Sequence, residues 1–128
     1  MIAVDTNVWV RYVTNDDHRQ AARAIALLAK EEVFVPKTVL LELEWVLRAV
    51  YGLPVKSVHR AMLHILGLPN VRPEQPEQVA RAMDHYSRGL DFVDALHLAA
   101  SGQAEVFHTF DTKFAKRAKS LGLPVESI

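Results

Sequence analysis

Residues 1–7, MIAVDTN, place a short apolar run directly before an acidic and polar cluster. An apolar run of this kind, bounded by Asp, Thr and Asn, indicates a buried strand that ends at a turn or at a helix start. Asp5 then has two interpretations. It can cap the following helix by accepting a hydrogen bond from a free N–H group, which is the commoner role. It can also serve chemistry at the end of the strand, and the rest of the sequence has to decide.

The remaining chain alternates short β-rich runs with longer helical patterns. Strands are predicted at residues 2–4, 33–35, 70–72, 105–110 and 124–128, and helices at 7–13, 17–30, 37–51, 54–66, 73–88, 92–101 and 112–121. Such alternation is typical of a parallel sheet whose strands are connected by crossover helices. The sequence therefore predicts an α/β fold, in a single domain that spans residues 1–128.

The composition excludes several functional classes. The absence of cysteine excludes disulfides and thiolate chemistry and predicts a reducing, cytoplasmic location. We expect neither a signal peptide at the start nor a membrane span, because no apolar run is long enough. Fifteen basic residues balance fifteen acidic ones, so the overall charge does not indicate nucleic acid binding.

Local positive charge is more informative. The segment KFAKRAK at residues 113–119 gathers basic side chains on one short helix, and Arg11 follows the opening motif by one helical turn. The simpler interpretation of such a segment is a solvated helix face. The alternative is that these residues bind RNA, with Arg11, Lys113, Lys116 and Arg117 as the candidates and Lys119 beside them.

Acidic residues stand at the ends of two predicted strands and at the start of one helix. Asp5 ends the first strand and Asp111 ends the fourth. Right-handed crossovers place the carboxyl ends of parallel strands on one edge of the sheet, where ligands bind. Asp91 and Asp94 lie three residues apart, on one face of a predicted helix. Each of these aspartates also has a structural interpretation, as an N-cap or a first-turn acid.

Glu42 is harder to explain structurally. The core stripe of its helix is predicted to consist of Leu40, Leu43, Leu47 and Val50. Glu44 has a partner four residues on in Arg48, whereas Glu42 has none and lies on a largely apolar flank. An uncompensated carboxylate in apolar surroundings is costly, so Glu42 requires a cation or a hydrogen-bond donor.

The predicted topology brings Asp5, Glu42, Asp94 and Asp111 together. Clustered carboxylates repel one another unless a cation lies between them. Oxygen ligands without cysteine suit Mg²⁺ or Mn²⁺ better than zinc. Such a site can activate water and neutralise a phosphate, so the chemistry it predicts is phosphodiester hydrolysis.

Four segments in order resemble the PIN-domain ribonucleases, and within them the VapC toxins of bacterial toxin–antitoxin modules. These are VDTNVWVR (4–11), VLLELEWVLRAVYG (39–52), LDFVDALHLAA (90–100) and HTFDTKF (108–114). The resemblance implies a three-layer α/β/α fold with a central parallel sheet of four to five strands. It also implies a Mg²⁺- or Mn²⁺-dependent endoribonuclease toxin.

The resemblance further assigns roles by position. Catalysis and metal binding fall to Asp5, Glu42, Asp94 and Asp111, with Asp91 as an additional metal ligand, and support falls to Thr6, Asn7 and Thr109. His97 stands where relatives more often have an aliphatic residue, which leaves its role open. The implied partners are RNA, a second copy of the toxin, and a VapB-like antitoxin that inserts a basic residue into the acidic pocket. The helices at 17–30 and 37–51 are a candidate groove for that antitoxin.

Two other classes remain as alternatives. A receiver-type phosphoacceptor module requires paired acids after the first strand and an acceptor aspartate after a middle strand, and VFVPKT at 33–38 has none. A phosphatase of the haloacid-dehalogenase type requires DxD after the first strand, where this chain has Asn7 as the third residue. Labelling as an acyl phosphate would favour either of them over a nuclease.

Overall fold

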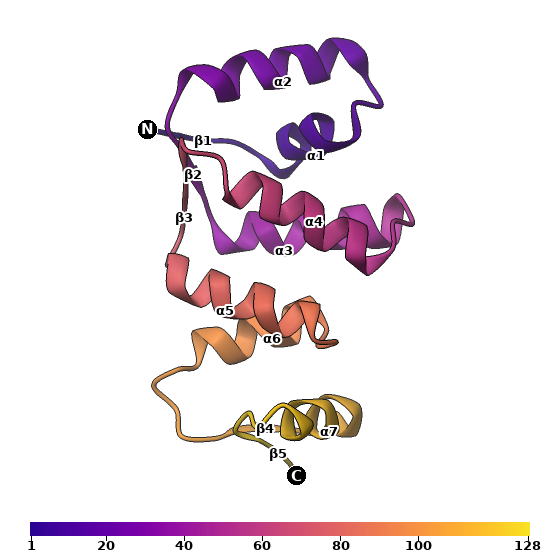
Figure 1. The fold of residues 1–128 in the computed structure, drawn as a ribbon, viewed down its shortest axis with the longest axis vertical. Coiled ribbons are helices and arrows are strands. Elements are labelled where there is room, and N and C mark those ends of the chain that lie inside the picture. Colours follow the sequence, from indigo (N-terminus) through magenta and orange to yellow (C-terminus); the bar gives the residue numbers. More distant parts are fainter. The chain divides into compact units, whose positions relative to one another are not determined.

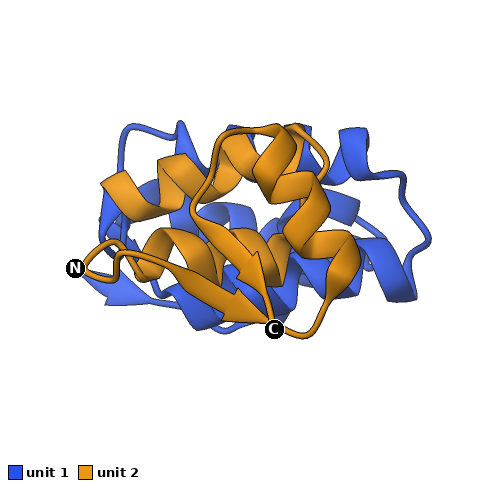
Figure 2. Cartoon of the chain, turned by 90° about the horizontal axis from the view of Figure 1, so that it is seen from below, with its two compact units in different colours: residues 1–76 blue, residues 77–128 orange.

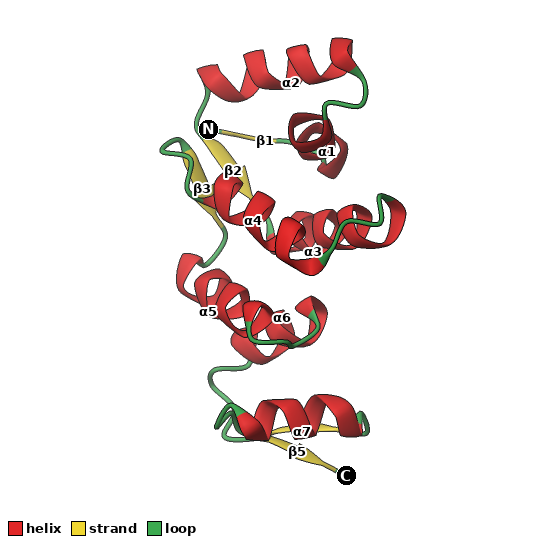
Figure 3. Cartoon of the chain, turned by 45° about the vertical axis from the view of Figure 1, so that its right-hand side comes forward, coloured by secondary structure: helices red, strands yellow, loops and turns green.

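The computed structural model describes residues 1–128, which form two compact units, Met1–Pro76 and Glu77–Ile128 (Figure 2). Helices make up most of both units, and the strands are short (Figure 3). None of the helices is both long and apolar enough to cross a membrane.

The first unit contains a parallel sheet of three strands with helices between them (Figure 1). Its elements in chain order are β1 (Ile2–Ala3), α1 (Thr6–Thr14), α2 (His18–Lys30), β2 (Val33–Val35), α3 (Lys37–Trp45), the π-helix η1 (Val46–Val50), α4 (Val55–Leu66) and β3 (Val71–Pro73). The strand order is β1-β2-β3, with Ile2 opposite Val33 and Val33 opposite Val71.

Polar residues define both ends of the first helix. Asp5 caps the start of α1, and Asn15 ends it in the left-handed conformation with φ 52°. Helix α1 packs against α2 and against α3. Trp9 on α1 is fully buried, as are Val33 and Val35 of the central strand β2. The expectation that the first strand is buried is wrong: β1 is an edge strand in which Ile2 is half-buried and Ala3 is exposed.

The predicted core stripe of the third helix is correct for Leu40, Leu43 and Leu47, which are fully buried, but wrong for Val50, which is 62% exposed. The reason is the π-helix η1, which replaces the last α-helical turn. Its backbone hydrogen bonds span five residues instead of four, as from the Tyr51 N–H to the Val46 carbonyl at 3.0 Å. The wider turn rotates Val50 out of the stripe.

The second unit contains three helices and a parallel pair of strands. Its elements are α5 (Pro76–Ser87), α6 (Phe92–Ala100), β4 (Phe107–Thr109), α7 (Thr112–Ser120) and β5 (Val125–Ser127), α5 beginning at the boundary residue. Helix α7 is the crossover between β4 and β5, which pair in parallel. It packs on them through Phe114, whose ring lies 5.8 Å from that of Phe107 in an edge-to-face contact.

The α/β class predicted from the sequence is confirmed, and every strand pair is parallel. All five predicted strands are present, three in the sheet of the first unit and two in that of the second. The strand ends differ from prediction by at most two residues, as where 105–110 shortens to Phe107–Thr109, and the second strand matches its prediction. Strands β1 and β4 each lead into a helix through a short turn, and Asp5 and Asp111 lie at these two junctions as helix N-caps.

Candidate active site

The aspartates of the second unit stand at the N-termini of two helices. Asp91 caps α6, and its Oδ1 accepts hydrogen bonds from the N–H groups of Val93 (3.0 Å) and Asp94 (3.4 Å). Asp111 caps α7, and its Oδ1 accepts from the N–H of Phe114 at 3.0 Å. In both carboxylates Oδ2 makes no hydrogen bond. Capping thus fixes the direction of each side chain and leaves one oxygen for a ligand.

The turn before Asp111 is held by the preceding strand. The hydroxyl oxygen of Thr109 accepts a hydrogen bond from the N–H of Asp111 at 2.9 Å. The backbone at the end of β4 is therefore fixed on both sides of the loop, by Thr109 before Asp111 and by the cap after it. The hydroxyl of Thr109 thus supports the backbone of Asp111 and makes no hydrogen bond with the Asp111 carboxylate.

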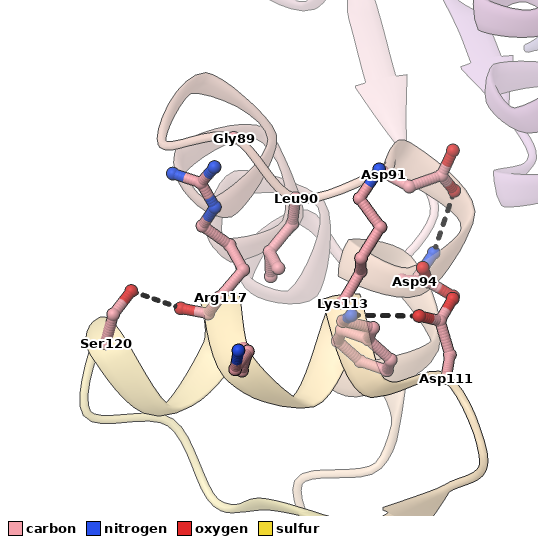
Figure 4. Close-up of a pocket in the computed structure, with 10 residues that line it drawn as sticks. Gly89, Leu90, Asp91, Asp94, Asp111, Lys113, Arg117 and Ser120 are labelled. Carbon is pink, nitrogen blue, oxygen red and sulfur yellow. Dashed lines mark hydrogen bonds between the residues drawn. The ribbon is translucent and has the colours of Figure 1, made fainter.

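These aspartates line one pocket of about 670 Å³ within the second unit (Figure 4). Its acidic lining residues are Asp91, Asp94 and Asp111, its basic ones are Lys113, Lys116 and Arg117, and Gly89, Leu90, Phe114 and Ser120 complete it. The carboxylates come from the starts of α6 and α7, while the basic residues follow along α7. The pocket is consequently acidic at one end and basic along one wall.

Asp94 carries the clearest electrostatic signature in this pocket. Burial of its carboxyl group, and then the negative charges of Asp91 and Asp111, raise the pKa of Asp94, while His97 lowers it. A cation bound between these carboxylates would relieve their repulsion. His97 lies one turn further along α6 and offsets part of that repulsion.

The donor chemistry of the pocket fits a divalent cation of the Mg²⁺ type, which prefers carboxylate oxygens and keeps several water ligands. The side chains are not gathered as a closed cluster, however. No group of three or more His, Asp or Glu side chains lies close enough together to hold a metal ion. The fit therefore rests on the kind of donors and on their mutual repulsion.

Asp5 and its neighbours lie in the first unit. The Oδ1 atom of Asp5 accepts a hydrogen bond from the N–H of Thr6 at 2.7 Å, as a cap of α1. The hydroxyl of Thr6 is buried and has no hydrogen-bond partner. Asn7 is exposed and lines a shallow groove with Arg11 between α1 and α2. Thr6 thus supports Asp5 through its backbone only.

Glu42 also lies in the first unit, and one expectation about it is wrong. We expected apolar surroundings that make its charge costly, but Glu42 is exposed and makes no hydrogen bond or ion pair. The glutamate buried in this helix is Glu44, which is 1% exposed and pairs with Arg48 as the sequence suggests. Two of the apolar neighbours of Glu42, Trp45 and Ala49, are exposed with it, Trp45 to 53%, and Val46 is half-buried.

The side chain of Arg11, a candidate for RNA binding, is held by hydrogen bonds within the first unit. Its Nε donates to Gln20 at 2.6 Å, and its Nη1 donates to Asp16 and to the Tyr51 hydroxyl, both at 3.1 Å. The Tyr51 hydroxyl in turn donates to Asp16 at 2.6 Å. This network joins the end of α1 to the start of α2 and to the residue after η1. Few donors of Arg11 remain for a ligand.

Sequence reasoning did not identify Gly89 as part of the pocket. Gly89 has φ +104°, a backbone conformation that residues other than glycine rarely adopt, and it lies against the guanidinium of Arg117. The signal available in the sequence is the RGLD segment at 88–91, a glycine between a helix end and a capping aspartate. Such a glycine predicts a turn, but it does not show which side chain packs on it.

Comparison with known families identifies the family of the chain. The PIN domain model matches residues 2–120, so this chain belongs to the PIN domain family. No curated protein matches the sequence significantly. PIN domains are generally nucleases, hydrolases that bind nucleic acid and typically use divalent metals. The family favours phosphodiester hydrolysis over the phosphoacceptor and phosphatase alternatives.

Proposed function

We propose that this protein is a Mg²⁺- or Mn²⁺-dependent endoribonuclease and the toxin of a VapBC-type module. The observation that carries the proposal is the single pocket that combines Asp91, Asp94 and Asp111 with basic residues of α7. Carboxylates suit a divalent cation, and cations suit the phosphates of a nucleic acid strand. A pocket with both is suited to hydrolysis of a phosphodiester.

A divalent cation bound there would supply an activated water molecule and would neutralise charge on the scissile phosphate. The chain supplies orientation. The caps of α6 and α7 hold Asp91 and Asp111 with one carboxylate oxygen free. Lys113 extends from α7 toward Asp91 at the acidic end of the pocket (Figure 4). Its ammonium group can hold a phosphate oxygen against the repulsion of the carboxylates.

Asp5 and Glu42 are proposed for the same reaction because their motifs match the family pattern. Asp5 has a carboxylate oxygen that makes no hydrogen bond, and Glu42 has no partner at all. Neither side chain is needed for an internal ion pair. Their contribution is tested by substitution, Asp5→Asn and Glu42→Gln, with cleavage as the measurement.

The toxin role implies an antitoxin and a second toxin copy as partners. Exposed apolar side chains support it: Ile25 and Leu27 on α2, and Trp45 on α3. The antitoxin groove is predicted between the helices at 17–30 and 37–51. In the structure these helices, α2 and α3, each pack against α1. A basic antitoxin side chain would find its complement among the aspartates of the pocket.

The nuclease proposal is tested with purified protein and an unstructured RNA, with Mg²⁺ or Mn²⁺ and with a chelator. We expect cleavage only with metal, and products with 5′-phosphates. Asp94→Asn should abolish it, whereas Asp84→Asn, an exposed aspartate paired with Arg88 outside the pocket, should not. Cleavage that survives chelation, or ends with 2′,3′-cyclic phosphates, contradicts the mechanism. Equal cleavage of single-stranded DNA contradicts the ribonuclease assignment.

The toxin proposal has a separate test in a bacterial host. Induced expression should arrest growth, Asp94→Asn should not, and co-expression of the neighbouring gene in the source genome should restore growth. If cells grow normally while they express an active nuclease, the nuclease proposal stands and the toxin proposal is wrong.

A further inference from the structure

The guanidinium of Arg117 packs against the backbone of Gly89. A Cβ atom at position 89 would lie 3.3 Å from Nη1, 3.4 Å from Cζ and 3.5 Å from Nε of Arg117. In the pocket, Arg117 points to Gly89, away from the carboxylates of Asp94 and Asp111 (Figure 4). The turn before α6 therefore acts as a platform for this guanidinium, and glycine at position 89 allows both the close approach and the φ of +104°.

The positive charge of Arg117 is not used internally. The salt bridges within this unit join Asp84 to Arg88 and, when His85 is protonated, to His85, and Glu126 to Lys119. Neither Arg117 nor Lys116 pairs with a carboxylate, although both line the pocket. The hydroxyl of Ser120, which also lines it, donates to the Arg117 carbonyl at 2.6 Å. The free donors at this end of the pocket are thus cationic, which suits a phosphate.

The two ends of the pocket hold their cations differently. Lys113 lies on α7 near Asp111, and its side chain extends toward Asp91 in Figure 4. Arg117 lies one helical turn further along α7, against Gly89. A single phosphate at the acids leaves Arg117 without a ligand. A nucleic acid strand that crosses the pocket brings a second phosphate to it.

We propose that Arg117, with Lys116 beside it, binds the phosphate next to the scissile one, and that Gly89 positions the guanidinium for this. The planar guanidinium can hold a phosphate with two parallel hydrogen bonds, which a lysine cannot do. The inference rests on the proposed nuclease function. It adds that the preferred substrate has two successive charged phosphodiesters, one cut and one held.

The test uses a short single-stranded oligoribonucleotide that contains the strongest cleavage site of the wild-type protein. Two further substrates carry an uncharged methylphosphonate in place of the phosphodiester on the 5′ or on the 3′ side of that site. The proteins are wild type, Arg117→Gln and Lys119→Gln. Lys119 is the matched control: the sequence places it beside the RNA-binding candidates on the same helix, but it pairs with Glu126 and does not line the pocket.

We expect Arg117→Gln to lower kcat/KM about tenfold or more on the unmodified substrate, as loss of a charged hydrogen bond does. One of the two methylphosphonates should lower wild-type cleavage by a similar factor. On that substrate Arg117→Gln should lose nothing further, because the interacting pair is already broken. Lys119→Gln should match the wild type on every substrate.

Independent, additive losses overturn the inference, since they mean that Arg117 does not contact the flanking phosphate. Equal cleavage by Arg117→Gln and wild type overturns it as well. If the wild type cleaves no RNA, the proposed function fails, and the subsite is then judged by binding. Fluorescence anisotropy of a labelled oligoribonucleotide in chelator should show weaker affinity for Arg117→Gln than for Lys119→Gln. Equal affinity of these two variants for the oligoribonucleotide overturns the proposed subsite.

Discussion

The carboxylate of Glu44 and the guanidinium of Arg48 lie one helical turn apart, with Nε 2.7 Å from Oε2. Glu44 is buried, while Glu42, two residues earlier on the same helix, is exposed. The two glutamates therefore have opposite surroundings within one turn. Burial and an ion pair make Glu44 a structural residue, and exposure leaves Glu42 available for chemistry.

Substitution of these two glutamates should separate stability from activity. Glu44→Ala should lower the free energy of unfolding by about 3 kcal/mol, the lower end for a broken buried pair, because Arg48 is partly exposed. Glu42→Gln should change stability by less than about 0.5 kcal/mol, as exposed substitutions do, and should lose RNA cleavage. Urea unfolding and a cleavage assay measure both. The assignment is wrong if Glu42→Gln cleaves RNA normally.

Asp111 has two roles, and two variants separate them. Asp111→Asn should keep the cap of α7 and most of the stability, because asparagine caps as well as aspartate. Asp111→Ala should lose about 1 kcal/mol of unfolding free energy. Both should lose metal-dependent cleavage. An active Asp111→Asn protein would reduce Asp111 to a helix cap.

A divalent metal ion should stabilise the wild type more than it stabilises Asp94→Asn. The raised pKa of Asp94 means that its ionised form destabilises the native state at neutral pH, a cost that disappears as the pH falls below about its ordinary value of 3.8. In chelator at neutral pH, Asp94→Asn should therefore melt at or above the wild type. With Mn²⁺ at a hundredfold excess over Kd, the wild type gains about 2.7 kcal/mol by linkage. Equal gains in both proteins would exclude Asp94 as a ligand.

The network around Asp16 gives a prediction about pH. Hydrogen bonds from Tyr51 and then Thr14 lower the pKa of Asp16, with Arg11 adding a smaller effect. Tyr51→Phe should raise that pKa toward its ordinary value of 3.8. A depressed native pKa stabilises the fold above the unfolded value, and this contribution is lost as the pH falls through the native one. The stability difference between the variant and the wild type should shrink in acid, and NMR titration of Asp16 gives its pKa directly.

The sequence predicts the helices and the parallel strands well, because apolar periodicity and capping residues such as Asp5 and Asp111 are local signals. It does not predict the π-helix, so Val50 is wrongly placed in the core. The exposure of Glu42 is missed because the sequence does not show that its apolar neighbours Trp45 and Ala49 are themselves exposed. In the pocket, Asp91, Asp94 and Asp111 are identified by their motifs. The contact of Gly89 with Arg117 depends on a turn conformation that no local pattern specifies.

The π-helix at Val46–Val50 also determines which insertions and deletions the chain tolerates. An α-helix turns by about 100° per residue, so removing one residue from η1 would restore α-helical hydrogen bonding and rotate the next residues by that angle. Tyr51 would then point away from Asp16 and Arg11, which it contacts from the residue directly after η1. Natural relatives that lack one residue here should also lack the tyrosine or its aspartate. The length of this helix and the identity of two distant side chains should be inherited together.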